Sequence, residues 1–436
     1  MLALLLGLAG FLVYHFTVHT IRNQRPVGGA NVDVTREEGT TQSVAAFAVD
    51  PRRPRTLFGA SEELRVYASS DGGRHWAVQA SPRLTRGCAH GAPQAVADGR
   101  GREYLAFLAA ATCGDTLTPY VVVTWRDGPD GRWSAPVRVA PPLWRYGFDD
   151  APSLAVDEGS GRLYLAWTRS LRRNAATVVA ASSDDGGRTW SKPVALEPPG
   201  DEPHSATVAV SPAGDVYVAG IDSRHGTWLV RSRDRGRSFS RPIAAAPLVA
   251  NPSSECAFSG FSPIPTEEKT CAGPDPTVLA GRAGVYLVYD DFAANQTADV
   301  LVAAFDLALR RRFVARVSPP DRGRAQQFFP AAAIDRRTGV LWACWYDTTF
   351  DPHAHRAWFT CSASRDGRTW TSPVRAAAVP TPPNVLYGIQ ARGGLRTAVA
   401  AARGVAHAFW ADGRLVDDTT DLFTAGVPQR TAFEQR

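Results

Sequence analysis

A turn motif that recurs along the chain constrains the fold more than any other feature. It combines Ser, Asp, Gly and an aromatic residue, and its full or degenerate copies lie at 69–76, 130–133, 183–190, 232–239 and 364–370. The aromatic residues Trp76, Trp133 and Trp190 are each separated by 57 residues. Self-similarity at such an interval is typical of repeat architectures, among them propellers and solenoids.

Each copy lies in the same order of short apolar segments. Around the copy at 183–190, three apolar segments precede the motif, at 152–157, 163–167 and 177–181, and a polar segment follows it at 190–194. Four short antiparallel strands in a unit of about 40–50 residues describe one blade of a β-propeller. The sequence therefore predicts an all-β fold of the propeller type.

The number of blades follows from the number of such units. First strands are expected to begin near Val44, Pro93, Pro152, Ala206, Pro276, Pro330 and Arg396. The seventh unit ends after its third strand, at 421–425, so we expect the segment 31–35 to supply the fourth strand and close the ring without an open edge. Seven four-stranded blades are the prediction, with six blades as the alternative.

The chain opens with an apolar segment. Residues 1–18 are apolar except for His15 and Thr17, and about 20 apolar residues span a bilayer, with roughly 17 as the lower limit. No basic region precedes the apolar run, as it would in a secretory signal peptide. We expect four parts: a membrane anchor or signal segment at 1–18, a linker at 19–30, the propeller at 31–428 and a tail at 429–436.

The cysteines indicate the compartment. They form three sequence-local pairs, which are Cys88 with Cys113, Cys256 with Cys271, and Cys344 with Cys361. None lies in a C-x-x-C motif, and such pairs are typical of disulfides, hence of an oxidising compartment. Six buried thiols in a cytosolic protein are the alternative. Arg22 and Arg25 after the apolar run favour a cytoplasmic body. We give the cysteines more weight and predict an extracytoplasmic body, anchored to the cell membrane or secreted if the segment is cleaved.

The charge argues against nucleic acid as a partner. The net charge is +6, and no basic run is longer than 310–312. Proteins that bind nucleic acid concentrate positive charge on one face, whereas here Arg and Asp or Glu are interspersed. We expect a monomer whose partner is a glycan or an extracellular protein.

The turn motif itself predicts structural chemistry. Asp-Gly at a hairpin tip supplies residue types that tolerate the left-handed conformation. The Asp carboxylate accepts N–H bonds within its own turn, and the aromatic ring packs beside a neighbouring strand. These aspartates are therefore expected to be structural and not catalytic.

The motif resembles a known one. S-x-D-x-G-x-T-W is similar to the Asp-box of sialidase-type (BNR-repeat) propellers, and the following W-S-x-P-V at 133–137 and 190–194 is similar to that family too. In the last blade, 387–390 and 409–414 resemble the closing blade of bacterial Asp-box proteins. The resemblance covers roughly 31–428 and implies a propeller with a sialidase-like glycosidase site for acidic glycans. Asp-boxes also occur in propellers without glycosidase activity, so a binding or scaffold propeller is the alternative.

A propeller brings polar loop residues together at one end. Asp-boxes join third and fourth strands, so the loops before first strands and after second strands meet at the opposite mouth of the channel, the usual place for a ligand. Carboxylates, arginines and aromatic rings gathered there are suited to carbohydrate. The candidates are Arg145, Asp149, Asp150, Glu202, His204, Asp222, Arg224, Asp347, Tyr387, Asp412 and Arg414.

The resemblance also implies roles. Sialidases use a Tyr nucleophile activated by a Glu, with an Asp as acid/base, and so depart from the usual pair of carboxylates. Tyr387, Glu202 and Asp150 are the corresponding catalytic candidates. Three arginines bind the substrate carboxylate in that family, and the candidates here are Arg145, Arg224 and Arg414. The remaining candidates, which are Asp149, His204, Asp222, Asp347 and Asp412, are expected to bind substrate.

Two observations keep alternatives open. The F/Y-R-I-P motif of the first sialidase arginine is absent, because 23–26 reads NQRP. A repeated W-x-D-x-R after second strands would also suit a structural role, in which Asp–Arg pairs link neighbouring blades. Clustered carboxylates could instead hold a structural Ca²⁺; no other cofactor is expected.

Overall fold

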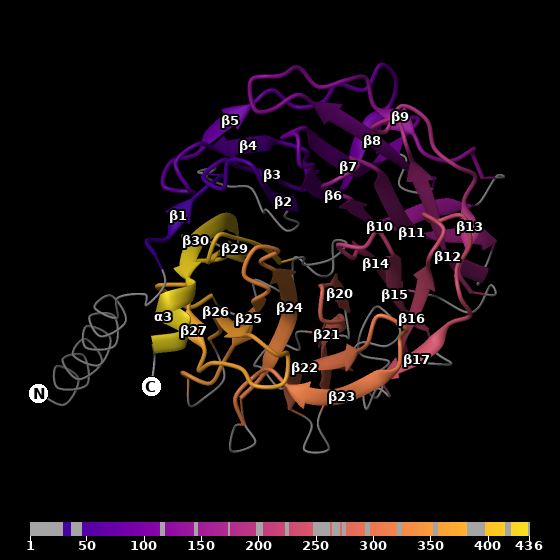
Figure 1. Cartoon of the computed structure of the whole chain (residues 1–436). Helices are drawn as coiled ribbons and strands as arrows, with labels where there is room; N and C mark the ends of the chain where they lie inside the picture. Colours follow the sequence, from indigo (N-terminus) through magenta and orange to yellow (C-terminus); the bar gives the residue numbers. More distant parts are fainter. Residues whose placement is uncertain are drawn as a thin grey trace, which may run out of the picture.

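The computed structural model describes the following residues: 29–35, 46–113, 118–143, 147–172, 175–197, 204–222, 226–246, 262–263, 271–272, 276–292, 297–320, 325–351, 356–381, 397–414 and 420–434. Seven antiparallel four-stranded sheets are arranged around one axis (Figure 1). The protein is thus an all-β propeller with seven blades, as predicted, and the six-bladed alternative is wrong.

Six blades are built from four consecutive strands each. Blades 1 to 3 contain β2 (Ala46–Val49), β3 (Leu57–Ala60), β4 (Val66–Ser69) and β5 (Ala77–Gln79); β6 (Cys88–Ala97), β7 (Glu103–Ala110), β8 (Tyr120–Arg126) and β9 (Val137–Arg138); and β10 (Phe148–Val156), β11 (Leu163–Arg172), β12 (Ala175–Ser183) and β13 (Val194–Ala195). Blades 4 to 6 contain β14 (His204–Val210), β15 (Val216–Asp222), β16 (Gly226–Ser232) and β17 (Ile243–Ala246); β20 (Thr277–Ala280), β21 (Val285–Phe292), β22 (Ala298–Phe305) and β23 (Arg311–Arg316); and β24 (Gln327–Ile334), β25 (Leu341–Asp347), β26 (Trp358–Ser364) and β27 (Val374–Arg375).

Blade 7 closes the ring with strands from both ends of the chain. It pairs β28 (Ala398–Ala402), β29 (Val405–Asp412) and β30 (Asp421–Pro428) with β1 (Val32–Asp33) from the other end of the chain. Figure 1 shows indigo β1 beside yellow β30. Outside the blades, the described residues also form a ribbon of β18 (Ser262–Pro263) with β19 (Cys271–Ala272) and the short helix α3 (Gln429–Glu434).

The closing strand has the predicted partner. Val32 pairs with Thr424, and Asp33 pairs with Phe423. The Thr35 hydroxyl donates to the Asp421 carboxylate at 2.8 Å, so the sheet edge of blade 7 is covered. The pairing of 31–35 with 421–425 is therefore confirmed.

The cores lie between blades, and the Asp-box aromatics fill them. Small and β-branched residues of the inner strands are almost fully buried, which suits sheets packed face to face. Trp76 lies 6.0 Å from Phe409 of blade 7, measured between ring centroids. Trp133, Trp190, Phe239 and Trp370 likewise pack against the buried clusters that join their blade to the preceding one. Each hairpin thus places an aromatic side chain in the interface between its own blade and the preceding one.

The Asp-box carboxylates accept hydrogen bonds from their own turns, as expected. Asp185 accepts the Thr189 N–H at 2.9 Å and the Ser183 hydroxyl at 2.9 Å, while the Gly187 N–H donates to that hydroxyl at 2.8 Å. Gly186 and Gly187 hold φ angles of 72° and 89°, where a residue without Cβ is favoured. The same side-chain pattern recurs at Asp71, Asp234 and Asp366.

Two of the three predicted disulfides are described. Cys88 bonds Cys113, and Cys344 bonds Cys361 across β25 and β26. Cys256 lies outside the described residues, so its bond to Cys271 stays a prediction. The segment 1–18, for which an anchor was predicted, is also outside them. In the part of the chain that the structure describes, no helix has the length and apolar character needed to cross a membrane.

The Cys256–Cys271 pair can be tested directly. We expect a non-reducing peptide map of the full chain to contain a linked Cys256–Cys271 peptide beside the two bonds above. Alkylation of Cys256 in the native, unreduced protein would contradict this pairing.

The Asp-boxes predict an acid-sensitive fold. Hydrogen bonds from the Ser238 hydroxyl and backbone lower the pKa of Asp234 to about 2. A carboxyl with a lowered folded-state pKa stabilises the fold above its unfolded pKa of about 4, and this contribution is lost as pH falls toward about 2. We expect the free energy of unfolding, measured in urea from pH 6 to pH 2, to fall less in Asp234→Asn than in the wild type. Asp130→Asn, at an exposed position of the degenerate copy, is the control and should retain the wild-type slope.

Candidate functional site

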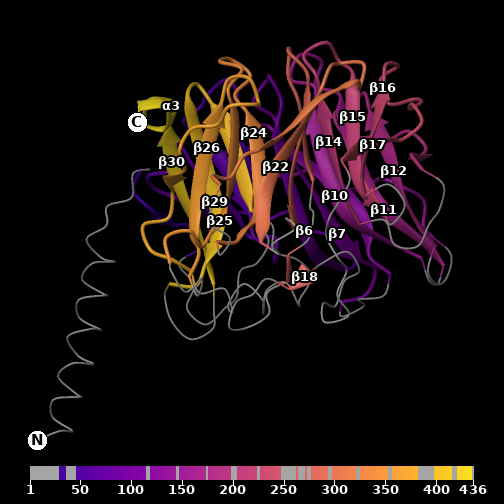
Figure 2. The ribbon, with the colours of Figure 1, turned by 90° about the horizontal axis from the view of Figure 1, so that it is seen from below.

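Turns of three blades are joined across the axis at the Asp-box end of the ring. The first strands of neighbouring blades contact one another all around the ring, and the strands run between two ends (Figure 2). At the Asp-box end, Arg336 of blade 6 reaches across the axis. Its Nη2 donates to the Val210 carbonyl of blade 4 at 3.1 Å, and its Nε lies 3.0 Å from the Glu158 carboxylate of blade 3. Burial raises the pKa of Glu158, and Arg336 opposes that shift.

The opposite end gathers the predicted carboxylates. Asp149 lies at the start of β10 and is 2% exposed. It accepts bonds from the Trp167 indole at 2.9 Å and the Arg169 Nε at 2.8 Å, both on β11. The partner Arg169 was not among the sequence candidates. It follows Trp167 by two residues, which is the position that Asp takes in the W-x-D-x-R pattern at the end of a second strand.

Asp412 is tied to Arg414 in the same way. The Asp412 carboxylate has no exposed area and accepts the Trp410 indole N–H at 2.9 Å and the Arg414 backbone N–H at 3.0 Å. The Arg414 guanidinium donates to Asp412 and, at 3.0 Å, to the Asn31 side chain. Asn31 in turn accepts the Ala378 N–H at 2.6 Å. This chain of contacts links the loop after β29 to the closing segment and to blade 6.

Asp347 ends β25 and is fully buried. Its carboxylate accepts the Thr349 N–H at 2.8 Å and the Trp345 indole N–H at 3.3 Å. Burial raises the pKa of Asp347, although the bonds from Thr349 and Trp345 oppose the shift. Shifted pKa values are frequent at functional sites and also occur in structural networks of buried groups.

The remaining candidates are described only in part. Asp150 is exposed at the end of the ring, and its carboxylate accepts the Ala151 N–H at 2.6 Å. His204 begins β14 and Asp222 ends β15, but their side chains are outside the description. Four candidates lie wholly outside the described residues, and these are Arg145, Glu202, Arg224 and Tyr387.

The described candidates lie at one end of the ring, but the structure describes no contact between the Asp149, Asp347 and Asp412 side chains. Asp149, Asp347 and Asp412 belong to blades 3, 6 and 7, and each is bonded by a Trp from the second strand of its own blade. Asp412 ends β29 and its partner Arg414 follows two residues later in the same blade, whereas the alternative interpretation placed such pairs between blades. Within the described part of the chain, no group of three or more His, Cys, Asp or Glu side chains is placed to hold a metal ion.

Comparison with known proteins supports the architecture. No family model and no curated protein matches the sequence. The structure is similar to the GH93 α-L-arabinofuranosidase of Fusarium graminearum in complex with arabinobiose, with 11% identity over 94% of this chain and 100% of that chain and a TM-score of 0.53. The same enzyme with an iminosugar inhibitor matches at 11% identity, over 93% and 99% of the chains, with a TM-score of 0.53.

A sialidase also matches, but less well. The Trypanosoma rangeli sialidase is 12% identical, with 92% of this chain and 59% of that chain covered and a TM-score of 0.44. At 11% identity, the arabinofuranosidase shows the shared fold alone. The sialidase, at its lower TM-score, adds no argument about fold or activity.

The Asp412–Arg414 contact predicts a stability effect. Arg414→Ala leaves a buried carboxylate without its cation, which we expect to lower the free energy of unfolding by about 3 kcal/mol. Asp412→Ala combined with Arg414→Ala should cost less than the sum of the two single changes, because the double variant leaves no unpaired charge. Urea denaturation measures all three variants. Additive costs, or an Arg414→Ala variant as stable as the wild type, would show that the pair does not hold the loop.

Proposed function

We propose that the chain is an extracytoplasmic, glycan-acting propeller with its site at the end of the ring opposite the Asp-boxes. The observation that carries this proposal is the set of acidic, cationic and aromatic side chains described at that end. At one end Arg336 joins blade 6 to blades 3 and 4 across the axis. At the other, Asp149, Asp347 and Asp412 lie at strand ends of three blades, each beside an indole, and Asp149 and Asp412 also lie beside a guanidinium. Acidic, cationic and aromatic groups together suit the hydroxyl and carboxylate groups of sugars.

The finer proposal is a sialidase-like exo-glycosidase that acts on acidic glycans. The arabinofuranosidase with the similar fold is a glycosidase whose complex contains arabinobiose, which supports a sugar ligand for this architecture. A sialidase-like reaction would begin with the Tyr387 phenol, deprotonated by Glu202, attacking the anomeric carbon. Asp150 would protonate the departing glycosidic oxygen and then deprotonate the water that releases the sugar.

Substrate binding is assigned to the other candidates. Arg145, Arg224 and Arg414 would hold the sugar carboxylate through charge-assisted bonds. His204 and Asp222 would bind the hydroxyl groups, while Asp149, Asp347 and Asp412, which are buried and bonded within the protein, would position the loops around the sugar. The reaction needs neither cofactor nor metal.

The two disulfides support the location. Disulfides persist in oxidising compartments, and both described bonds join strands or loops of the body. We therefore propose a body outside the cytoplasm, held at the membrane by residues 1–18 or secreted after their removal.

A non-catalytic propeller that binds a glycan or an extracellular protein is the second candidate. The observation that favours it is how completely the described charges at this end serve structural contacts. Arg169 is bonded to Asp149, and Arg414 is bonded to Asp412 and Asn31. Side chains held in this way form a rigid polar surface without supplying a reacting group.

Tyr387→Phe separates the two candidates. If the phenol is the nucleophile, this change should lower the hydrolysis of a fluorogenic sialoside by at least a hundredfold while glycan binding on an array is retained. Tyr164→Phe, in β11, is the control and should leave turnover unchanged. The full chain is assayed between about pH 4 and pH 8, where carboxyl and His groups titrate.

Hydrolysis and glycan binding by the wild-type protein test the two proposals themselves. Hydrolysis of neither a sialoside nor an arabinofuranoside in this pH range, together with binding on the array, would refute the glycosidase and support the binding propeller. Wild-type protein that neither hydrolyses nor binds any glycan would refute both glycan proposals.

A further inference from the structure

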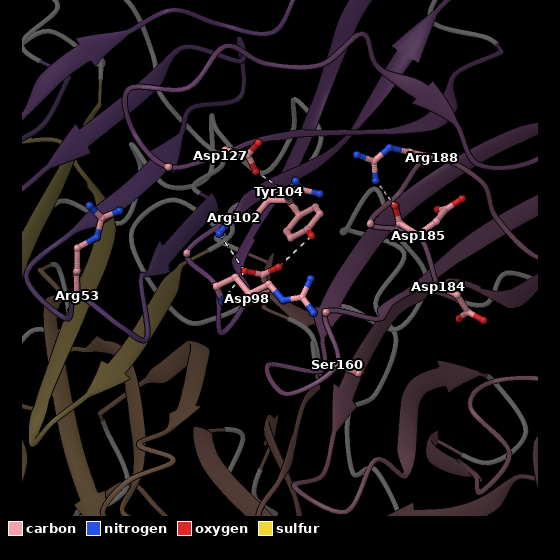
Figure 3. Close-up of a pocket in the computed structure, with 14 residues that line it drawn as sticks. Arg53, Asp98, Arg102, Tyr104, Asp127, Ser160, Asp184, Asp185 and Arg188 are labelled. Atoms are coloured by element: carbon pink, nitrogen blue, oxygen red, sulfur yellow. Dashed lines mark hydrogen bonds and ion pairs between the residues drawn. The ribbon is translucent and has the colours of Figure 1, made fainter.

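A polar hollow lies at the Asp-box end, away from the proposed glycan site. It has a volume of about 440 Å³ and lies between turns of blades 1, 2 and 3 (Figure 3). Its wall includes Arg53, the β6–β7 turn at 98–102, Tyr104, and the Asp-box at 184–188. We call it the blade 2–3 hollow.

Two carboxylates that line the blade 2–3 hollow, those of Asp98 and Asp185, already accept hydrogen bonds within the protein. Asp98 accepts the backbone N–H groups of Arg100 and Arg102, at 2.8 and 2.9 Å, and the Tyr104 hydroxyl at 3.2 Å. Asp185 accepts bonds from Ser183 and Thr189 in the Asp-box turn. Their acceptor capacity is therefore largely used within the protein.

The guanidinium groups retain more of their donors. Each guanidinium has five N–H donors in a planar fork. Arg102 uses its Nε on Asp127 at 2.6 Å, and Arg188 donates one Nη1 bond to the Asp185 carbonyl while lying over the Trp125 ring. Arg100 bonds other described residues through its backbone, and its guanidinium makes no ion pair with them. Asp127 and Asp184 also line the hollow and are paired with Arg102 and Arg162, so the remaining N–H groups of Arg100, Arg102 and Arg188 are the donors open to a ligand.

Three of these polar groups converge above Gly186. A Cβ placed on Gly186 would lie 3.1 Å from Arg102 Nη1, 3.5 Å from the Tyr104 hydroxyl and 3.6 Å from Arg188 Nη1. Glycine leaves this space open. The backbone alone does not demand glycine, because Arg235 occupies the equivalent position of the blade 4 Asp-box with a φ of 66°.

We propose that the blade 2–3 hollow binds a small oxyanion, a sulfate or a sugar carboxylate, through Arg100, Arg102 and Arg188. Guanidinium forks bind such oxyanions with paired, charge-assisted hydrogen bonds. A volume of about 440 Å³ is within the range of small-molecule sites, so the anion and an attached sugar ring both fit. The site is independent of the proposed glycosidase chemistry at the other end.

The test titrates the full chain with sodium sulfate and with glucuronate at constant ionic strength, by calorimetry. Arg100→Gln combined with Arg188→Gln should weaken binding at least tenfold, because two charged ligands are lost. Arg237→Gln is the matched control, since Arg237 occupies the position of Arg188 in the blade 4 Asp-box and does not line the hollow. It should leave affinity within twofold of the wild type.

A second variant fills the hollow without removing charge. Gly186→Asn places a side chain between Arg102 and Tyr104 and should abolish binding of both probes. Gly72→Asn makes the same change in the blade 1 Asp-box, where a Cβ meets only Arg55 Cγ at 4.0 Å, and should retain binding. This pair controls for backbone strain, since both glycines have positive φ.

The outcomes are distinct. Glucuronate binding more tightly than sulfate would identify an acidic sugar as the ligand, whereas equal affinities would identify a free oxyanion; both support the site. Absence of binding by the wild type, or equal losses in Arg237→Gln and in the double variant, would overturn the proposal. Loss of glycan hydrolysis in Tyr387→Phe has no bearing on these titrations.

Discussion

The pairing of β1 with β30 determines whether seven sheets form a ring or an open stack. Val32 and Asp33 complete blade 7, and without them β30 would present an unpaired edge of the kind that promotes aggregation. The ring also closes through side chains, because Phe47 of blade 1 stacks on Phe409 of blade 7 with ring centroids 5.0 Å apart. Each blade buries one face against each neighbour, so every interface depends on closure elsewhere in the ring.

The described contacts at the two ends of the closed ring have different roles. Asp-box carboxylates satisfy N–H groups within tight turns, and Arg336 joins turns across the axis, so the Asp-box end is built for cohesion. At the opposite end, Asp149 and Asp347 are buried among indole donors. A buried charge persists only with partners, which explains why each of these aspartates ends or begins a strand beside a Trp.

The regular features of the fold could be predicted from sequence because they are local. Strand periodicity, the Asp-Gly turns and the adjacent strands that carry Cys344 and Cys361 all follow from spacing within one blade. Contacts between distant turns could not be predicted. Arg336 reaches Glu158 across the axis, and the blade 2–3 hollow combines residues of three blades. For Asp149 and Asp412, sequence predicted the end of the ring, but it could not show that Arg169 and Arg414 were already bonded to them.

The central claim is that β1 makes the seven blades one cooperative unit. Native-state hydrogen exchange of the full chain, followed against urea concentration, measures this most directly. The Val34 N–H, which donates to the Leu422 carbonyl at 2.8 Å, should exchange with the same opening free energy and urea dependence as amides in β7 and β15. Exchange of Val34 and Leu422 at low urea, while those inner strands stay protected, would contradict the claim and show that blade 7 opens on its own.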